Sequence, residues 1–125
     1  MPIENFDHLH KLHQEWKKDL LLSEKEIKSL QEELGELARR PLGRDQQAKV
    51  EHFQNALIRQ KEVVNDELQL IIKGDKMMSE GDGNDAQLHM LHNKLQDDMD
   101  TFDRLFIDLR EEFKAFKRSL AAPGE

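Results

Sequence analysis

Residues 88–120 read LHMLHNKLQDDMDTFDRLFIDLREEFKAFKRSL, and this stretch decides the fold. Apolar residues recur in it at alternating steps of four and three, and His92 is the one polar residue in the row. Such steps keep side chains on one face of an α-helix, because the helix has 3.6 residues per turn. The sequence predicts a long amphipathic helix over about 84–121, whose apolar face needs partner helices. The row comprises Leu88, His92, Leu95, Met99, Phe102, Phe106, Leu109, Phe113, Phe116 and Leu120.

The first forty residues carry the same rhythm. Proline suits the first turn of a helix and asparagine suits its N-cap, so we expect the helix to start between Pro2 and Asn5. Pro41 cannot continue a helix, which places the end near Arg40. The first helix is therefore predicted at about 4–40. Its apolar row reads Phe6, Leu9, His13, Trp16, Leu20, Ser23, Ile27, Leu30, Leu34 and Leu37, with a histidine and a serine as polar members.

A middle helix is predicted between the first and last helices, over about 45–73. Asp45 can cap its start, and Gly74 offers a left-handed cap at its end. The segment 74–83 (GDKMMSEGDG) is rich in glycine and acid and is expected to be a mobile loop. Asn84 then begins a capping box for the last helix. The core row of this middle helix is predicted as Val50, Phe53, Leu57, Gln60 or Lys61, Val64, Leu68 and Ile71.

Three long helices with short connections favour one all-α domain over residues 1–125. The expected architecture is an up-down-up antiparallel three-helix bundle of coiled-coil type. It resembles a spectrin-type repeat in length, in helix count and in having a tryptophan, Trp16, in the first helix. The last helix carries phenylalanines where that family would have a second tryptophan, so the resemblance assigns no family.

Composition narrows the function classes. The 26 acidic and 19 basic residues give a net charge of −7, which argues against a nucleic-acid partner. No apolar run approaches the roughly 20 residues that a membrane span needs. The chain has no cysteine, which excludes disulfides and thiolate metal sites. Its first residues lack the regions of a signal peptide. We expect a soluble cytoplasmic protein.

Five of the six histidines are expected at one pole of the bundle, where the first and last helices begin. Two readings remain open. Neutral imidazoles could bind a metal ion or report pH, or the core-facing His13 and His92 could simply pack and hydrogen-bond locally. His-Glu-x-x-His and Glu-x-x-His patterns are absent. Counted from Glu80, the acidic loop has Asp85 where a calcium-binding loop needs glycine at its sixth position, and Leu91 where it needs glutamate at its twelfth. The five are His8, His10, His13, His89 and His92.

Basic residues are expected at the opposite pole. Most of them lie in the last turns of helices, where the helix dipole favours positive charge, so solvated capping charge is preferred over a phosphate site. The sequence has no nucleophile-elbow context and no glycine-rich phosphate loop. It therefore predicts a protein that is not an enzyme, with no cofactor and no small-molecule substrate identified. The basic set is Arg39, Arg40, Arg44, Lys49, Lys114, Lys117 and Arg118.

Four apolar residues fall outside the predicted core at similar height: Leu21, Leu22, Ile58 and Ile107. A belt of exposed apolar side chains is typical of an association surface. The leading interpretation is an interaction or scaffold module that presents helix surfaces to a helical partner or to a second copy, as a homodimer. The alternative is a metal-binding or pH-sensing bundle that uses the five histidines.

Overall fold

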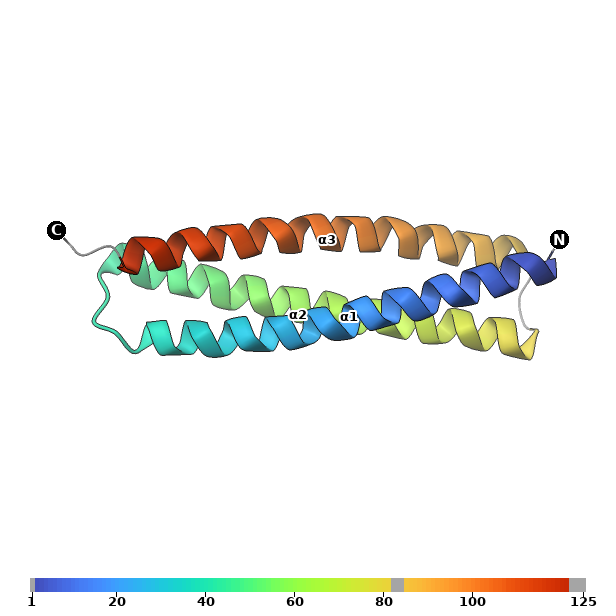
Figure 1. The fold of residues 1–125 in the computed structure, drawn as a ribbon, viewed down its shortest axis with the longest axis horizontal. Helices are drawn as coiled ribbons and strands as arrows, with labels where there is room; N and C mark the ends of the chain where they lie inside the picture. Colours follow the sequence, from blue (N-terminus) through green and yellow to red (C-terminus); the bar gives the residue numbers. More distant parts are fainter. Residues whose placement is uncertain (1, 82–84, 122–125) are drawn as a thin grey trace.

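The protein is a bundle of three long helices laid side by side (Figure 1). The computed structural model describes the backbone of residues 2–81 and 85–121, and the side chains of residues 7–81 and 86–121. Helix α1 spans Pro2–Ala38, α2 spans Arg44–Glu80 and α3 spans Asp85–Ala121. Helices α1 and α3 run in the same direction and α2 runs opposite to them. The predicted up-down-up three-helix bundle is confirmed.

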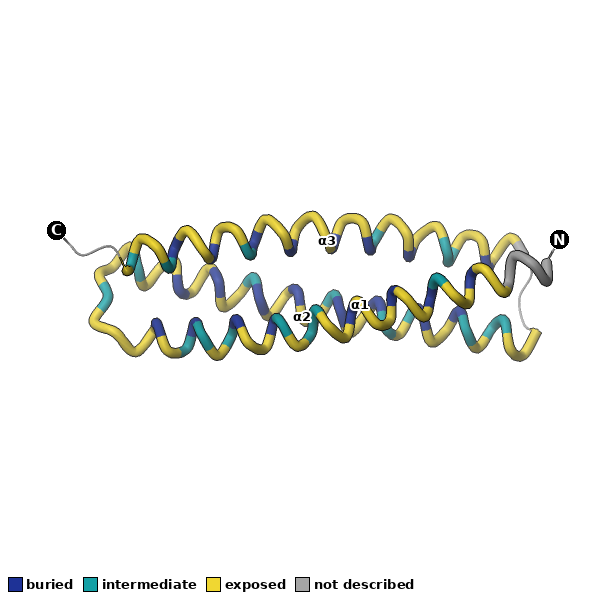
Figure 2. Tube along the Cα trace, in the orientation of Figure 1, coloured by how far each residue is buried: buried dark blue, intermediate teal, exposed yellow. Residues whose placement is uncertain are grey.

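Each helix buries one continuous stripe that faces the other two (Figure 2). Eight of the ten predicted positions on α3 are buried, and His92 and Leu120 are half-buried. On α1, every described member of the predicted row is buried except Ser23, which is half-buried. Phe6 lies outside the described side chains. Heptad spacing alone therefore located most of the core, because helical periodicity is a local property.

Aromatic rings fill the half of the core near the α1–α2 turn. Phe53 meets Phe113 and Phe116 at ring-centroid distances of 5.3 and 5.4 Å. Nearer the middle of α3, the rings of Phe102 and Phe106 stack with their centroids 5.6 Å apart. All five rings are buried. Aromatic rings contribute large buried areas together with favourable ring–ring geometry, so ring packing stabilises this part of the core.

The end of α2 differs from the prediction. The helix continues seven residues past Lys73 to Glu80, and Gly81, with φ of 68°, is the left-handed C-cap. Gly74 therefore does not end the helix, and the segment 74–80 is helical where a loop was expected. A Cβ on Gly74 would lie 3.0 Å from Leu91 Cδ2 and 3.1 Å from His13 Cε1. The glycine is needed because side chains of α1 and α3 occupy the space that its own side chain would fill.

The start of α2 also differs. Gly43, not Asp45, is the N-cap residue. Gln46 Oε1 accepts a hydrogen bond from the Gly43 backbone N–H at 2.9 Å, the contact that the third helical residue makes in a capping box. Asp45 lies in the first turn instead, where its charge still complements the helix dipole. The capping box predicted to begin at Asn84 lies outside the described residues.

One core position of α2 is wrong in the prediction. Glu67 is 5% exposed and belongs to the buried stripe, whereas Leu68 is only half-buried. The buried positions on α2 alternate steps of three and four without interruption: Val50, Phe53, Leu57, Gln60, Val64, Glu67, Ile71 and Gly74. Preferring an apolar residue over a charged one broke that alternation.

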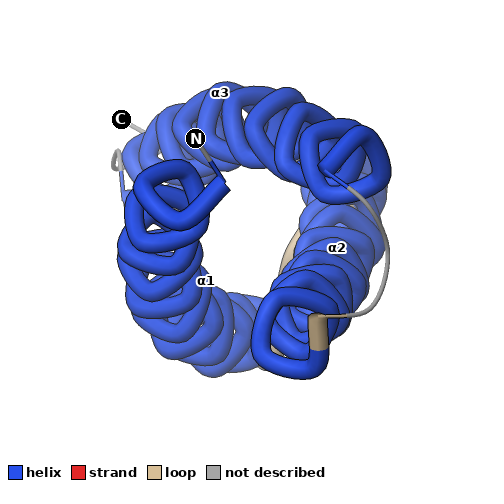
Figure 3. The backbone as a smooth tube through the Cα atoms, turned by 90° about the vertical axis from the view of Figure 1, so that its right-hand side faces the viewer, coloured by secondary structure: helices blue, strands red, loops and turns tan. Residues whose placement is uncertain are grey.

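Helices α1 and α3 are joined by a seam of charged side chains. The helices wind around a common axis (Figure 3), and α2 packs closely against both of the others, whereas the α1 and α3 backbones approach each other less. Arg110 bridges to Glu26 through two hydrogen bonds of 2.6 and 3.0 Å. Lys117 Nζ lies 2.6 Å from Glu33 Oε2. Both pairs are 84 residues apart, so the two parallel helices are in heptad register.

The same register places two like charges together. The pKa of Asp103 is raised by partial burial and by the carboxylates of Asp19 and Asp100. Asp19 and Asp103 occupy the seam position one heptad before Glu26 and Arg110.

None of the helices in the described part of the chain is long and apolar enough to span a membrane.

Candidate functional site

We call the end of the bundle that holds the five predicted histidines the histidine pole. There, Asp75 of α2 contacts two histidines of α1. His13 is 2% exposed, and its Nδ1 lies 3.1 Å from Asp75 Oδ1, the distance of a hydrogen bond donated to a carboxylate. His10 Nδ1 lies 3.6 Å from the same oxygen. Asp75 was expected in a mobile loop and instead sits on a helical turn, half-buried between two imidazoles. The extension of α2 past Gly74 is what positions it.

A second contact joins α1 and α3 at this pole. The rings of His13, Trp16 and His92 stack pairwise, with centroids 5.3 to 6.0 Å apart. Burial lowers the pKa of His92, and the neighbouring His13, His8 and His89 lower it further. The structure therefore gathers the predicted histidines.

Two imidazole nitrogens at this pole are buried without a partner. Among the described residues, His13 Nε2 and His92 Nδ1 find no hydrogen-bond partner. A buried polar atom without a partner costs on the order of 1–3 kcal/mol. Within residues 7–81 and 86–121, no three side chains of histidine, aspartate or glutamate converge so as to hold a metal ion.

The four predicted contact residues are exposed. Leu21, Leu22, Ile58 and Ile107 are exposed by 41%, 55%, 51% and 51%. Ile72, which the sequence argument missed, is exposed by 51% and lies two heptads after Ile58 on the same side of α2. The missed signal was its spacing of two heptad repeats from the outward-facing Ile58. Exposure at five such positions leaves a substantial apolar area in solvent.

These residues border a single face of the bundle, centred on α1. Ile72 lies one turn before Asp75, so it is on the side of α2 that meets α1, and Leu21 is on the matching side of α1. Leu22 lies one turn before Glu26, on the side of α1 that meets α3. We call this surface the α1 face, and it comprises Leu21, Leu22, Ile58, Ile72 and Ile107. A shallow hollow on α1 is lined by Leu21 and Leu22 together with three lysines, Lys17, Lys18 and Lys25.

A polar pocket lies between α2 and α3, at the core position that the sequence argument misassigned. Its volume is about 300 Å³. Glu67 and Gln60 line it, being 5% and 7% exposed, and the Oε1 atom of each lacks a hydrogen-bond partner among the described residues. Lys94 Nζ and Asp98 Oδ2 form an ion pair of 2.9 Å beside it. We call this site the Glu67 pocket.

Burial and neighbouring carboxyl groups shift the pKa of Glu67 in this pocket. Burial, then hydrogen bonding and repulsion from Asp98, raise the pKa of Glu67 to about 7, and Asp66 adds to the rise. Lys94 opposes it. The bond to Asp98 raises the pKa of Lys94. A pKa of about 7 means that Glu67 changes charge near neutral pH inside the bundle. The heptad spacing of α2 selects this position for burial, but a buried carboxylate is rare, and its pKa depends on the neighbouring groups of α3.

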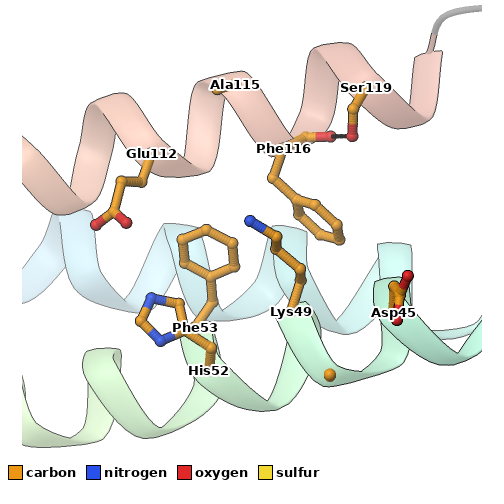
Figure 4. Close-up of a pocket in the computed structure, with 9 residues that line it drawn as sticks. Asp45, Lys49, His52, Phe53, Glu112, Ala115, Phe116 and Ser119 are labelled. Atoms are coloured by element: carbon orange, nitrogen blue, oxygen red, sulfur yellow. Dashed lines mark hydrogen bonds between the residues drawn. The ribbon is translucent and has the colours of Figure 1, made fainter.

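At the basic pole, α2 and α3 enclose an open groove of about 840 Å³ (Figure 4). Phe53 and Phe116 line it from opposite helices, and His52 and Lys49 stand beside them. Three of the seven basic residues predicted at this pole form ion pairs: Arg39 with Glu36, Lys114 with Glu111 and Lys117 with Glu33.

Comparison of the chain with protein-family models, with curated proteins and with solved structures finds no match.

Proposed function

We propose that the protein is a non-enzymatic interaction module that forms a homodimer through the α1 face. The observation that carries this proposal is the exposure of Leu21 and Leu22 in the middle of α1, with Ile58, Ile72 and Ile107 beside them. Covering apolar surface is the main favourable term in protein association. A symmetric dimer needs one patch that is complementary to itself.

The charges of α1 are complementary to themselves in an antiparallel pairing. A two-fold axis between Leu21 and Leu22 places Lys11 opposite Glu32 of the second copy. The same axis places Glu15 opposite Lys28, and each pair occurs twice by symmetry. All four side chains are exposed. Complementary charges of this kind set orientation and register at an interface.

One like-charged pair falls near the axis. Lys18 of one copy faces Lys25 of the other, and both are exposed. Lysine has a long flexible stem that can lie along apolar surface while its ammonium stays in water. The lysine stems can pack against Leu21 and Leu22 while their ammonium groups point into solvent. The repulsion between Lys18 and Lys25 therefore weakens the dimer without preventing it.

The test is the mass of the protein in solution. Light scattering at tens of micromolar should give the mass of two chains, and Leu21→Glu with Leu22→Glu should give one. Leu105→Glu is the matched control, because Leu105 is similarly exposed, at 48%, but lies on the α2–α3 side. A monomeric wild type, or a dimer that survives the double substitution, refutes the proposal.

A charge exchange tests the register. Lys28→Glu should weaken the dimer because it sets two glutamates against each other at each symmetric site. Adding Glu15→Lys should restore it. Equal weakening by the single and double variants would refute the antiparallel pairing while leaving association itself intact.

A second candidate function, pH sensing, rests on the buried imidazoles at the histidine pole. The pKa of His92 is lowered, so the folded chain binds fewer protons than the unfolded chain just below pH 6.5. The contribution of His92 to stability should therefore fall as the pH drops from 6.5 through the lowered value, opposite in direction to that of Glu67. Urea unfolding of the wild type and of His92→Gln at pH 7 and pH 5 measures this, and the wild type should lose stability relative to His92→Gln as the pH drops. His52→Gln, an exposed change at the other pole, is the control.

A further inference from the structure

We propose that the Glu67 pocket binds a small primary alkylammonium ion, with its ammonium group against Glu67 and Gln60. The pocket lies between α2 and α3, apart from the α1 face, so this inference is independent of the proposed dimer. Three features of the pocket favour this ligand: buried oxygens that lack donors, an excess of negative charge, and apolar walls.

Two buried oxygen atoms of the residues that line the pocket lack hydrogen-bond donors. Glu67 Oε1 and Gln60 Oε1 are acceptors with no partner among the described residues. Buried polar atoms are almost always hydrogen-bonded in folded proteins, so two such oxygens beside one pocket point to a missing donor. A primary ammonium supplies three N–H donors and no acceptor. It matches a site that offers oxygens.

The charges around the pocket favour a cation. Glu67 and Asp98 are the acidic residues that line the pocket and Lys94 is the basic one, so with Glu67 ionised two carboxylates face one ammonium. One further monovalent cation brings this group closer to neutrality, and buried charge is tolerated only when it is paired. A metal ion fits less well, since no three ligating side chains converge within the described residues.

The walls of the pocket select an amine with an apolar body. Val63, Phe102 and Leu105 line the pocket beside the polar groups, and Leu105 is 48% exposed. An alkyl chain lying along these side chains would remove their apolar surface from water. The volume of about 300 Å³ is at the small end of the range for ligand pockets. A short alkylamine satisfies both the walls and the size.

The test is titration calorimetry of the full chain with n-hexylamine at pH 8, where the amine is protonated. We expect saturable binding of one hexylammonium per chain, weakened about tenfold or more by Glu67→Gln. Glu62→Gln, the same change at an exposed site on the same helix, should leave the affinity unchanged. The uncharged n-hexanol should bind about tenfold more weakly or not at all. Titrations in two buffers of different ionisation enthalpy should show a proton released at pH 7, because the cation draws Glu67 into its charged form.

A second measurement keeps the outcome independent of any one variant. Amide chemical shifts of the wild-type protein should move with hexylamine at residues 60, 67, 98 and 105 and stay fixed around the histidine pole. Three results refute the proposal: no saturable heat up to about 10 mM, equal affinity for Glu67→Gln, or shifts spread evenly over the surface. The first is also what a buried water bridging the two oxygens would produce.

Discussion

Replacing Glu67 with glutamine should make the protein more stable at high pH and leave it unchanged at low pH. The folded-state pKa is raised from the ordinary 4.5 to about 7. A carboxyl with a raised pKa holds its proton more tightly in the folded state. Its contribution to stability is present below pH 4.5 and is lost as the pH rises through 7. At about 1.4 kcal/mol per pH unit, the loss amounts to about 3 kcal/mol as an upper value.

Urea unfolding of the wild type and of Glu67→Gln between pH 4 and pH 8.5 measures this difference. The two curves should agree near pH 4 and separate by up to about 3 kcal/mol at pH 8. Glutamine keeps the size of the side chain and cannot ionise, so packing should change little. Glu62→Gln, exposed on the same helix, should follow the wild type throughout. A gap that is constant with pH, or that widens toward acid, would show that Glu67 is not held in its protonated form by burial.

Three further changes test the packing. Gly74→Ala should destabilise the protein by about 1–3 kcal/mol, because the added methyl group meets side chains of α1 and α3. Gly35→Ala, where nothing lies within 4 Å, should stabilise it by up to about 1 kcal/mol in thermal unfolding, and the opposite order would contradict the position of Gly74. Phe106→Ala should cost about 3–5 kcal/mol in urea unfolding, since the ring is 3% exposed; a cost below about 1 kcal/mol would mean the ring is not in the core. Asp103→Asn should raise the melting temperature at pH 7 by removing repulsion from Asp19, and a benefit that persists at pH 3 would have another cause.

The stripes of α1 and α3 followed from sequence because a heptad row is a property of neighbouring residues. Leu20 and Phe106 are buried for the same reason that they could be predicted: each continues a row of apolar side chains on one side of its own helix. The outward positions of Leu21 and Ile107 follow from the same phase. The gathering of histidines at one pole required only the additional assumption that consecutive helices run antiparallel.

What the rows could not supply came from contacts between helices. Gly74 reads as a helix end in isolation, but it lies within α2, where His13 and Leu91 occupy the space that a side chain would fill. Glu67 reads as a surface residue because of its charge; the spacing of α2 already places it in the buried stripe, but its proximity to Asp98 and Lys94 of α3 depends on packing between helices. The ion pairs of α1 with α3, and the single face that joins exposed residues of three helices, depend on how the helices are set against one another. Sequence spacing determines which side of each helix is apolar, whereas packing between helices determines what each buried polar group meets.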